Sequence, residues 1–85
     1  MTSIEAKKII SHAMELSFGF APAHSKIVLS YFSDDEDNNG SLQIDIDFRI
    51  CDTEYGLIYH RGEYQLTRKD FYGYGHDLIM TFLNE

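Results

Sequence analysis

The sequence predicts an α+β protein of two layers, in which helices cover one face of an antiparallel sheet. Three features carry this prediction: a helix-capping signature at the start, strict alternation of apolar and polar residues over 41–50, and a second capping signature before an apolar C-terminal segment. The predicted order is helix, three antiparallel strands (or four, if the third divides) and helix, αβββα, with both helices on one face. The chain of 85 residues is expected to form a single domain, 1–85.

The first element is predicted to be a helix over residues 3–17. Thr2 and Glu5 stand three positions apart, which fits a capping box in which each side chain satisfies a backbone amide of the other. Apolar residues then recur near helical spacing. Gly19 is expected to end the helix, because glycine readily adopts the left-handed conformation of a helix C-cap.

Two strands joined by a turn are predicted next. Residues 26–33 are rich in β-formers, and Asn38 to Gly40 are typical of a tight turn. Residues 41–50 alternate so regularly that one face must be buried and the other wet. The expected buried face holds Leu42, Ile44, Ile46, Phe48 and Ile50, and the expected wet face holds Gln43, Asp45, Asp47 and Arg49.

The C-terminal third predicts a further strand and a final helix. Strand character resumes over 55–60, and Arg61 with Gly62 forms either a bend or a tight two-residue turn. The third strand therefore either continues to Leu66 or divides into two. Thr67, with Asp70 three positions later, resembles a helix N-cap. The apolar segment that follows predicts a helix from about 75 to 84.

The charge of the chain excludes several classes of partner. Fourteen acidic residues against seven basic ones give a net charge of −7. Direct binding to DNA, RNA or an anionic membrane requires a cationic surface, so none of these is expected. Cys51 has no second cysteine to pair with, and neither a signal peptide nor an apolar run of about 18 residues is visible. A cytoplasmic protein is therefore expected.

The acidic residues concentrate on one predicted hairpin. Four of them adjoin its turn, and two more stand at alternate positions of the following strand, about 6.7 Å apart. Such crowding costs self-repulsion, and it favours a surface whose field attracts a basic protein. Two tyrosines in a glycine-rich stretch could add contact anchors, as tyrosine often does at interfaces. The predicted partner-binding residues are Asp34, Asp35, Glu36, Asp37, Asp45, Asp47, Tyr72 and Tyr74.

Catalytic and metal chemistry have weaker support in the sequence. Asp35, Asp37, Asn39 and Gly40 match the first six positions of a calcium-binding EF-hand loop, but Ile46 stands where its bidentate Glu is required. The four histidines show no metal-ligand spacing. Cys51 could act as a thiol nucleophile beside His60 or His76, although a lone cysteine is more often a small apolar residue. We expect no cofactor, no metal and no enzymatic activity.

Two resemblances in outline bear on function. The predicted αβββα order is also that of the double-stranded RNA-binding domain, but the basic start of that family's last helix is absent and the charge has the wrong sign. The small size, the acidity and the predicted order resemble some phage-encoded anti-CRISPR proteins, particularly acidic inhibitors of the CRISPR nuclease. That resemblance covers the whole chain without a sequence motif, and Arg49, Arg61, Arg68 and Lys69 depart from it.

This resemblance implies a non-enzymatic inhibitor whose acidic side chains occupy a groove built for DNA. The expected partner is a basic, nucleic-acid-handling enzyme such as a bacterial defence nuclease, in the cytoplasm of the host. The alternative is a small adaptor or toxin-immunity protein, in which the aromatic second half carries binding. In that case the acidic turn would only be solvated.

Overall fold

The computed structural model describes residues 1–69 and 76–83, in which one α-helix packs on a five-stranded antiparallel sheet. The α+β class predicted from the sequence is confirmed. The elements are α1 (Ser3–Phe18), a short 3-10 helix η1 (His24–Lys26), β1 (Ile27–Glu36), β2 (Leu42–Ile50), β3 (Thr53–His60), β4 (Glu63–Lys69) and β5 (His76–Leu83).

The first helix begins and ends where the sequence predicts. The side chain of Thr2 accepts a hydrogen bond from the amide of Glu5 at 3.2 Å, and Glu5 accepts one from the amide of Thr2 at 3.3 Å. Gly19 closes the helix with a φ of 84°, a left-handed conformation that costs glycine little. Within the described residues, no helix is both long and apolar enough to cross a membrane.

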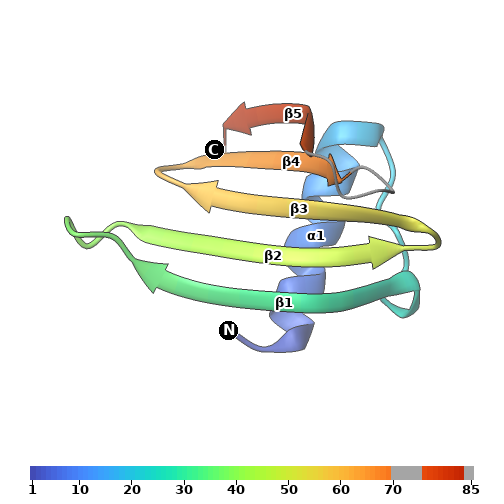
Figure 1. Ribbon diagram of the computed structural model, residues 1–85, viewed down its shortest axis with the longest axis horizontal. Helices are drawn as coiled ribbons and strands as arrows, with labels where there is room; N and C mark the ends of the chain where they lie inside the picture. The colour runs from blue at the N-terminus through green and yellow to red at the C-terminus, as the bar shows by residue number, and fades with distance from the viewer. Residues whose placement is uncertain (70–75, 84–85) are drawn as a thin grey trace.

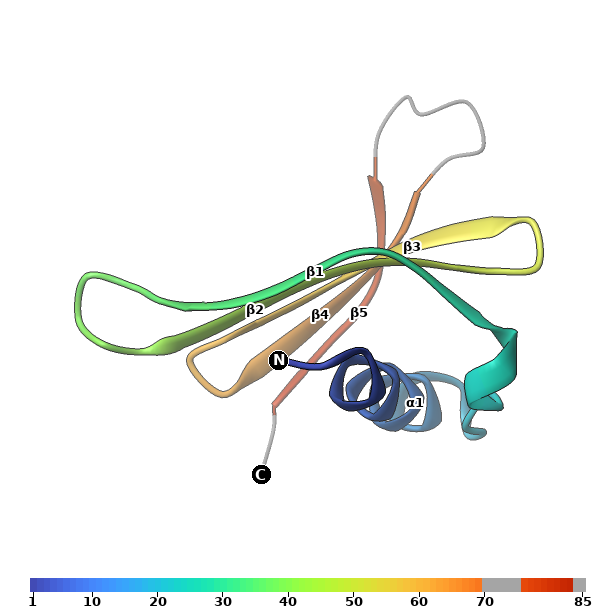
Figure 2. The same ribbon diagram turned by 90° about the horizontal axis from the view of Figure 1, so that it is seen from below.

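The sheet is a meander in which each strand pairs with the next in the order β1-β2-β3-β4-β5. Arg61 and Gly62 form the tight turn that divides the predicted third strand into β3 and β4, with φ values of 54° and 80°. Figure 1 shows α1 running across the strands, and Figure 2 shows it on one side of the sheet. The other side carries no further element of the described chain.

The hydrophobic core lies between α1 and the sheet face that it covers. Small residues of α1 let the helix approach the sheet closely, and large side chains from the three central strands fill the space. Ile46, Phe48, Leu57 and Leu66 are almost completely buried. The core consists of Ala6, Ile10, Ala13, Met14, Ile27, Ile44, Ile46, Phe48, Leu57, Tyr64 and Leu66.

A β-bulge in β1 reverses the facing of that strand's second half. The pairing to β2 shifts between Leu29 and Tyr31, so Ser30 is the extra residue. After the shift, Phe32 lies opposite Ile46 on the covered face, while Tyr31 lies opposite Asp47 on the other face. Residues that lie directly opposite share a face, so the bulge decides which acidic residues of β1 point away from α1.

The predicted C-terminal helix is wrong, and so is the αβββα order with two helices on one face. Thr67 belongs to β4, and residues 76–83 form β5 along the edge of β4. The backbone register sets Met80 opposite Leu66 and Phe82 opposite Tyr64. A short apolar run satisfies both helical and strand periodicity. Without a neighbour, the edge of β4 would leave backbone N–H and C=O groups without hydrogen bonds. A strand at residues 76–83 supplies these bonds, so the strand is favoured over the helix.

Adjacent residues of β3 test the one-sided burial. Leu57 is fully buried, whereas Ile58 is 39% exposed on the opposite face. Leu57→Ala should lower the free energy of unfolding by about 2–5 kcal/mol, because it removes buried methyl groups and leaves a cavity. Ile58→Ala, the matched control, should cost about 1 kcal/mol or less. Chemical denaturation measures both, and equal losses would contradict the assignment of faces.

Candidate functional site

The face of the sheet opposite α1, here called the open face, carries most of the polar side chains of the central strands. Cross-strand register defines its members, because opposed residues share a face. They are Val28, Tyr31, Ser33 and Asp35 of β1, Gln43, Asp45, Asp47 and Arg49 of β2, Glu54, Gly56, Ile58 and His60 of β3, and Glu63, Gln65, Thr67 and Lys69 of β4.

The acidic residues of β1 do not form one cluster. Asp34 and Glu36 lie opposite Ile44 and Leu42, on the side of α1, whereas Asp35 lies opposite Gln43 on the open face. The α-amino group of Met1 lies 3.2 Å from Oδ1 of Asp34. The sequence correctly predicts that these side chains are exposed. Because a strand alternates, however, it distributes them over two faces.

Asp37 holds the β1–β2 turn together. Its Oδ1 accepts hydrogen bonds from the backbone amides of Asn39 at 2.8 Å and Ser41 at 2.9 Å. Gly40 completes the turn with a φ of 78°. Side-chain capping of this kind replaces the backbone hydrogen bonds that a short turn leaves unmade. Asp37 therefore serves the fold, and it is less available to a partner than the sequence predicts.

Asp37 also connects two turns that are distant in sequence. Its Oδ2 lies 2.9 Å from Nε2 of His60 and 3.6 Å from Nη2 of Arg61, at the β3–β4 turn. Figure 1 shows the two turns at the same end of the sheet. The His60 hydrogen bond, followed by those from Ser41 and Asn39, lowers the pKa of Asp37 from 3.8 to about 2. The carboxylate can only accept, so Nε2 of His60 carries the hydrogen.

Asp47 has an internal partner that reaches it across a neighbouring strand. Nζ of Lys69 in β4 lies 2.8 Å from its Oδ1, although β3 runs between them. Gly56 of β3 lies opposite both Asp47 and Thr67. A Cβ there would stand 3.5 Å from the Asp47 carboxylate and 3.5 Å from Cε of Lys69. The missing side chain thus leaves room for the ion pair to cross β3.

Asp45 differs from Asp47, its neighbour on the same face. Within the described residues it has neither a hydrogen bond nor an ion pair. Partial burial raises the pKa of Asp45, and the nearby charge of Asp47 raises it further, while Lys69 acts in the opposite direction. Its carboxylate is therefore incompletely solvated and incompletely neutralised, which favours association with an external cation.

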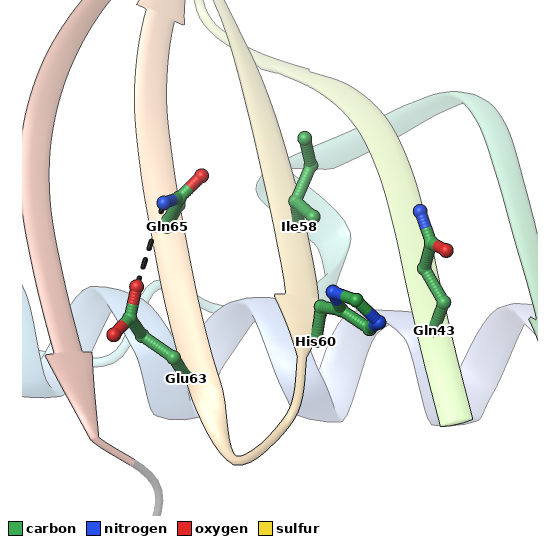
Figure 3. A pocket seen from close by; sticks show the side chains of 5 residues that line it. All are labelled: Gln43, Ile58, His60, Glu63 and Gln65. Carbon is green, nitrogen blue, oxygen red and sulfur yellow. Dashed lines mark hydrogen bonds between the residues drawn. The ribbon is translucent and has the colours of Figure 1, made fainter. Parts of the chain in front are cut away.

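A shallow pocket of about 170 Å³ lies on the open face, and one of its lining residues, Ile58, lies opposite Asp45. Figure 3 shows its lining side chains, and Nε2 of Gln65 donates to Oε1 of Glu63 at 3.5 Å. Ile58 supplies the apolar surface within a polar rim. The lining residues are Gln43, Ile58, His60, Glu63 and Gln65.

Three tyrosines of the second half, Tyr55, Tyr59 and Tyr64, pack in or against the core. Tyr55 stacks on Phe48 with ring centroids 5.2 Å apart, and Tyr59 packs on Tyr64 at 4.9 Å. The anchors predicted at Tyr72 and Tyr74 lie outside the described residues.

Sequence reasoning missed Tyr31, which is 52% exposed beside Asp47 on the open face. Regular alternation along β1 would place Tyr31 on the covered face. The bulge at Ser30 moves it to the open face, and this bulge has no clear sequence signal.

The described part of the chain brings few reactive groups together. No three His, Cys, Asp or Glu side chains within it could jointly hold a metal ion. Cys51 lies exposed in the β2–β3 turn, whereas His60 ends β3 at its far end, so these two do not form a thiol–imidazole pair.

Comparisons with protein-family models, with curated proteins and with solved structures find no match for this chain.

The role of Asp37 predicts a pH dependence of stability. Its pKa in the fold, about 2, lies below the ordinary 3.8, so ionisation stabilises the folded state. That contribution is complete above about pH 5 and is lost as the pH falls through 2. Asp37→Asn keeps an acceptor for the turn but removes the charge. It should lower stability at neutral pH and flatten the decline between about pH 4 and pH 2.

The exposed Asp52 in the β2–β3 turn provides the control. Asp52→Asn leaves all contacts of Asp37 in place, so it should keep the acid decline of the wild type. Urea denaturation at a series of pH values measures all three proteins. An Asp37→Asn profile parallel to that of wild type would refute the role assigned to Asp37.

Proposed function

We propose that the protein is a non-enzymatic inhibitor that binds a basic, nucleic-acid-handling enzyme through its acidic surface. A bacterial defence nuclease is the partner class that fits best. The binding surface comprises the open face and the adjoining acidic tip of the β1–β2 hairpin. Its carboxylates take the place of nucleic-acid phosphates in the partner's groove.

The observation that carries this proposal is an excess of uncompensated carboxylates on a face that α1 leaves uncovered. Among the residues of β1 to β4, the open face holds two Lys or Arg side chains, Arg49 and Lys69, and Lys69 is already bound to Asp47. Its acidic residues are Asp35, Asp45, Asp47, Glu54 and Glu63. Glu36 adds a further exposed carboxylate at the hairpin tip.

Such a surface supports binding in two ways. Its field accelerates the approach of a basic partner, because complementary charge raises association rates well above those of neutral surfaces. At contact, the carboxylates accept charge-assisted hydrogen bonds from the Arg and Lys side chains that grip phosphates. The exposed apolar surfaces of Tyr31 and Ile58 contribute contact area between these charges.

The test is displacement of DNA from captured enzymes. The tagged protein is incubated with a bacterial lysate, and each captured DNA-binding enzyme is purified and mixed with a fluorescent DNA duplex. Wild-type protein should displace the duplex, and less effectively as salt increases, because exposed charges are screened beyond about 8 Å at physiological ionic strength. Enzymes that keep their duplex at saturating concentrations of the protein would refute the proposal.

A charge-matched pair of double variants sharpens this test. Asp35→Asn with Glu36→Gln removes two binding-surface charges and spares Asp34 and Asp37, which have internal partners. Displacement should weaken by about 0.4–2 kcal/mol, at roughly 0.2–1 for each exposed pair.

The control removes two exposed acids elsewhere, Glu15 on α1 and Asp52 in the β2–β3 turn, as Glu15→Gln with Asp52→Asn. It leaves the same net charge as the test variant, and it should behave nearly as wild type. If both double variants weaken displacement equally, net charge is responsible and the acidic surface is not a specific site.

A further inference from the structure

Six residues of the open face form two adjacent cross-strand rows over β2, β3 and β4. In the first row, His60 lies opposite both Gln43 and Glu63. In the second row, Ile58 lies opposite both Asp45 and Gln65. Five of the six line the shallow pocket (Figure 3). Asp45, which lies opposite Ile58, completes the second row. We call these six residues the open-face site: Gln43, Asp45, Ile58, His60, Glu63 and Gln65.

The open-face site combines acceptors at its edge with an apolar centre. Asp45 and Glu63 stand at diagonal corners, and the carboxamide oxygens of Gln43 and Gln65 stand at the other two. Ile58, 39% exposed, presents apolar surface between them. Nε2 of His60 lies 2.9 Å from Asp37, so this nitrogen is already engaged. An occupant must therefore donate several hydrogen bonds, carry positive charge and possess an apolar stem.

We infer that the open-face site binds an arginine side chain of the partner, with Asp45 as its principal anion. This inference rests on the proposed function, since it names the chemical group through which a basic partner is recognised. The guanidinium offers five donors in a planar fork, which suits one carboxylate and the amide oxygens at the edge. Its methylene stem packs on Ile58.

Asp45 is the principal anion because the other candidates are engaged. Asp47 is bound to Lys69 at 2.8 Å, and Glu63 accepts from Gln65 at 3.5 Å. Within the described residues Asp45 has no such partner, and its half-buried carboxylate lies beside Ile58. Lysine fits less well, because its ammonium is a strongly hydrated point charge that cannot engage a carboxylate in a two-pronged manner.

A peptide titration tests the inference. Isotope-labelled protein is titrated with the peptide acetyl-Gly-Arg-Gly-Arg-Gly-amide, followed by NMR, and then with its lysine and citrulline analogues. The arginine peptide should shift the amide signals of Asp45, Ile58 and Gln65 most strongly. The lysine peptide should bind more weakly, and the citrulline peptide, which has nearly the same shape without the charge, should not bind measurably.

Variants of equal charge separate a local site from a diffuse field. Asp45→Asn should raise the Kd for the arginine peptide about tenfold, because it removes one charge-assisted hydrogen bond. Glu63→Gln should also weaken it, by a smaller factor. Asp52→Asn removes the same charge from an exposed position in the β2–β3 turn, which lies outside the open face. This control should change the Kd less than twofold.

The outcomes distinguish this inference from the proposed function. Equal effects of Asp45→Asn and Asp52→Asn, or equal affinity for the lysine and arginine peptides, would overturn the arginine site. Signal changes confined to the β1–β2 hairpin would overturn it as well. In each case, displacement of DNA by the wild-type protein would still support the proposed function. If the wild-type protein fails to displace DNA, both the proposed function and the arginine site are overturned.

Discussion

The packing of α1 across one face of the sheet is the constraint on which the rest of the structure depends. The 16 residues of α1 span about 24 Å, and five strands at a spacing of about 4.8 Å span about 19 Å. One helix laid across the strands is thus long enough to cross all five of them over the middle of one face (Figure 1). In the described residues nothing remains to cover the other, so the strands must alternate strictly between apolar and polar side chains.

The features that the sequence could predict are those that depend on residues close together in the chain. The regular pattern of β2 and the capping box at Thr2 are local signals, and both appear in the structure where predicted. The exposed acids of the β1–β2 hairpin follow from composition and turn chemistry. Their distribution over two faces does not, because it depends on the bulge at Ser30, and one inserted residue has no distinctive sequence signal.

The remaining features depend on contacts between residues distant in the chain. Asp37 meets His60 only because two turns lie at the same end of the sheet, 23 positions apart in sequence. Gly56 matters because an ion pair crosses it, which no local pattern announces. The sequence of β5 fits a helix as well as a strand, and hydrogen bonding to the edge of β4 favours the strand. In each case tertiary pairing supplies the information that local propensity lacks.

The acidic residues therefore fall into two groups, those with an internal ion pair and those without one. Asp34, Asp37 and Asp47 each have an internal cationic partner, and each pair joins segments that are distant in sequence. The partners are the α-amino group of Met1, Arg61 and Lys69, respectively. Asp35 and Asp45 have no ion pair among the described residues, and both face away from α1. Partial burial and the like charge of Asp47 beside it raise the pKa of Asp45, so this arrangement opposes folding at neutral pH.

A net charge of −7 alone would be explained by solubility, and charges dispersed over the whole surface would serve that purpose with less repulsion. Among the described residues, the open face instead holds its unpaired carboxylates close to exposed Tyr31 and Ile58, with few basic side chains beside them. Side chains on paired strands keep fixed positions, so a cationic partner meets a preformed arrangement. The placement of these charges, more than their number, is what supports a binding role.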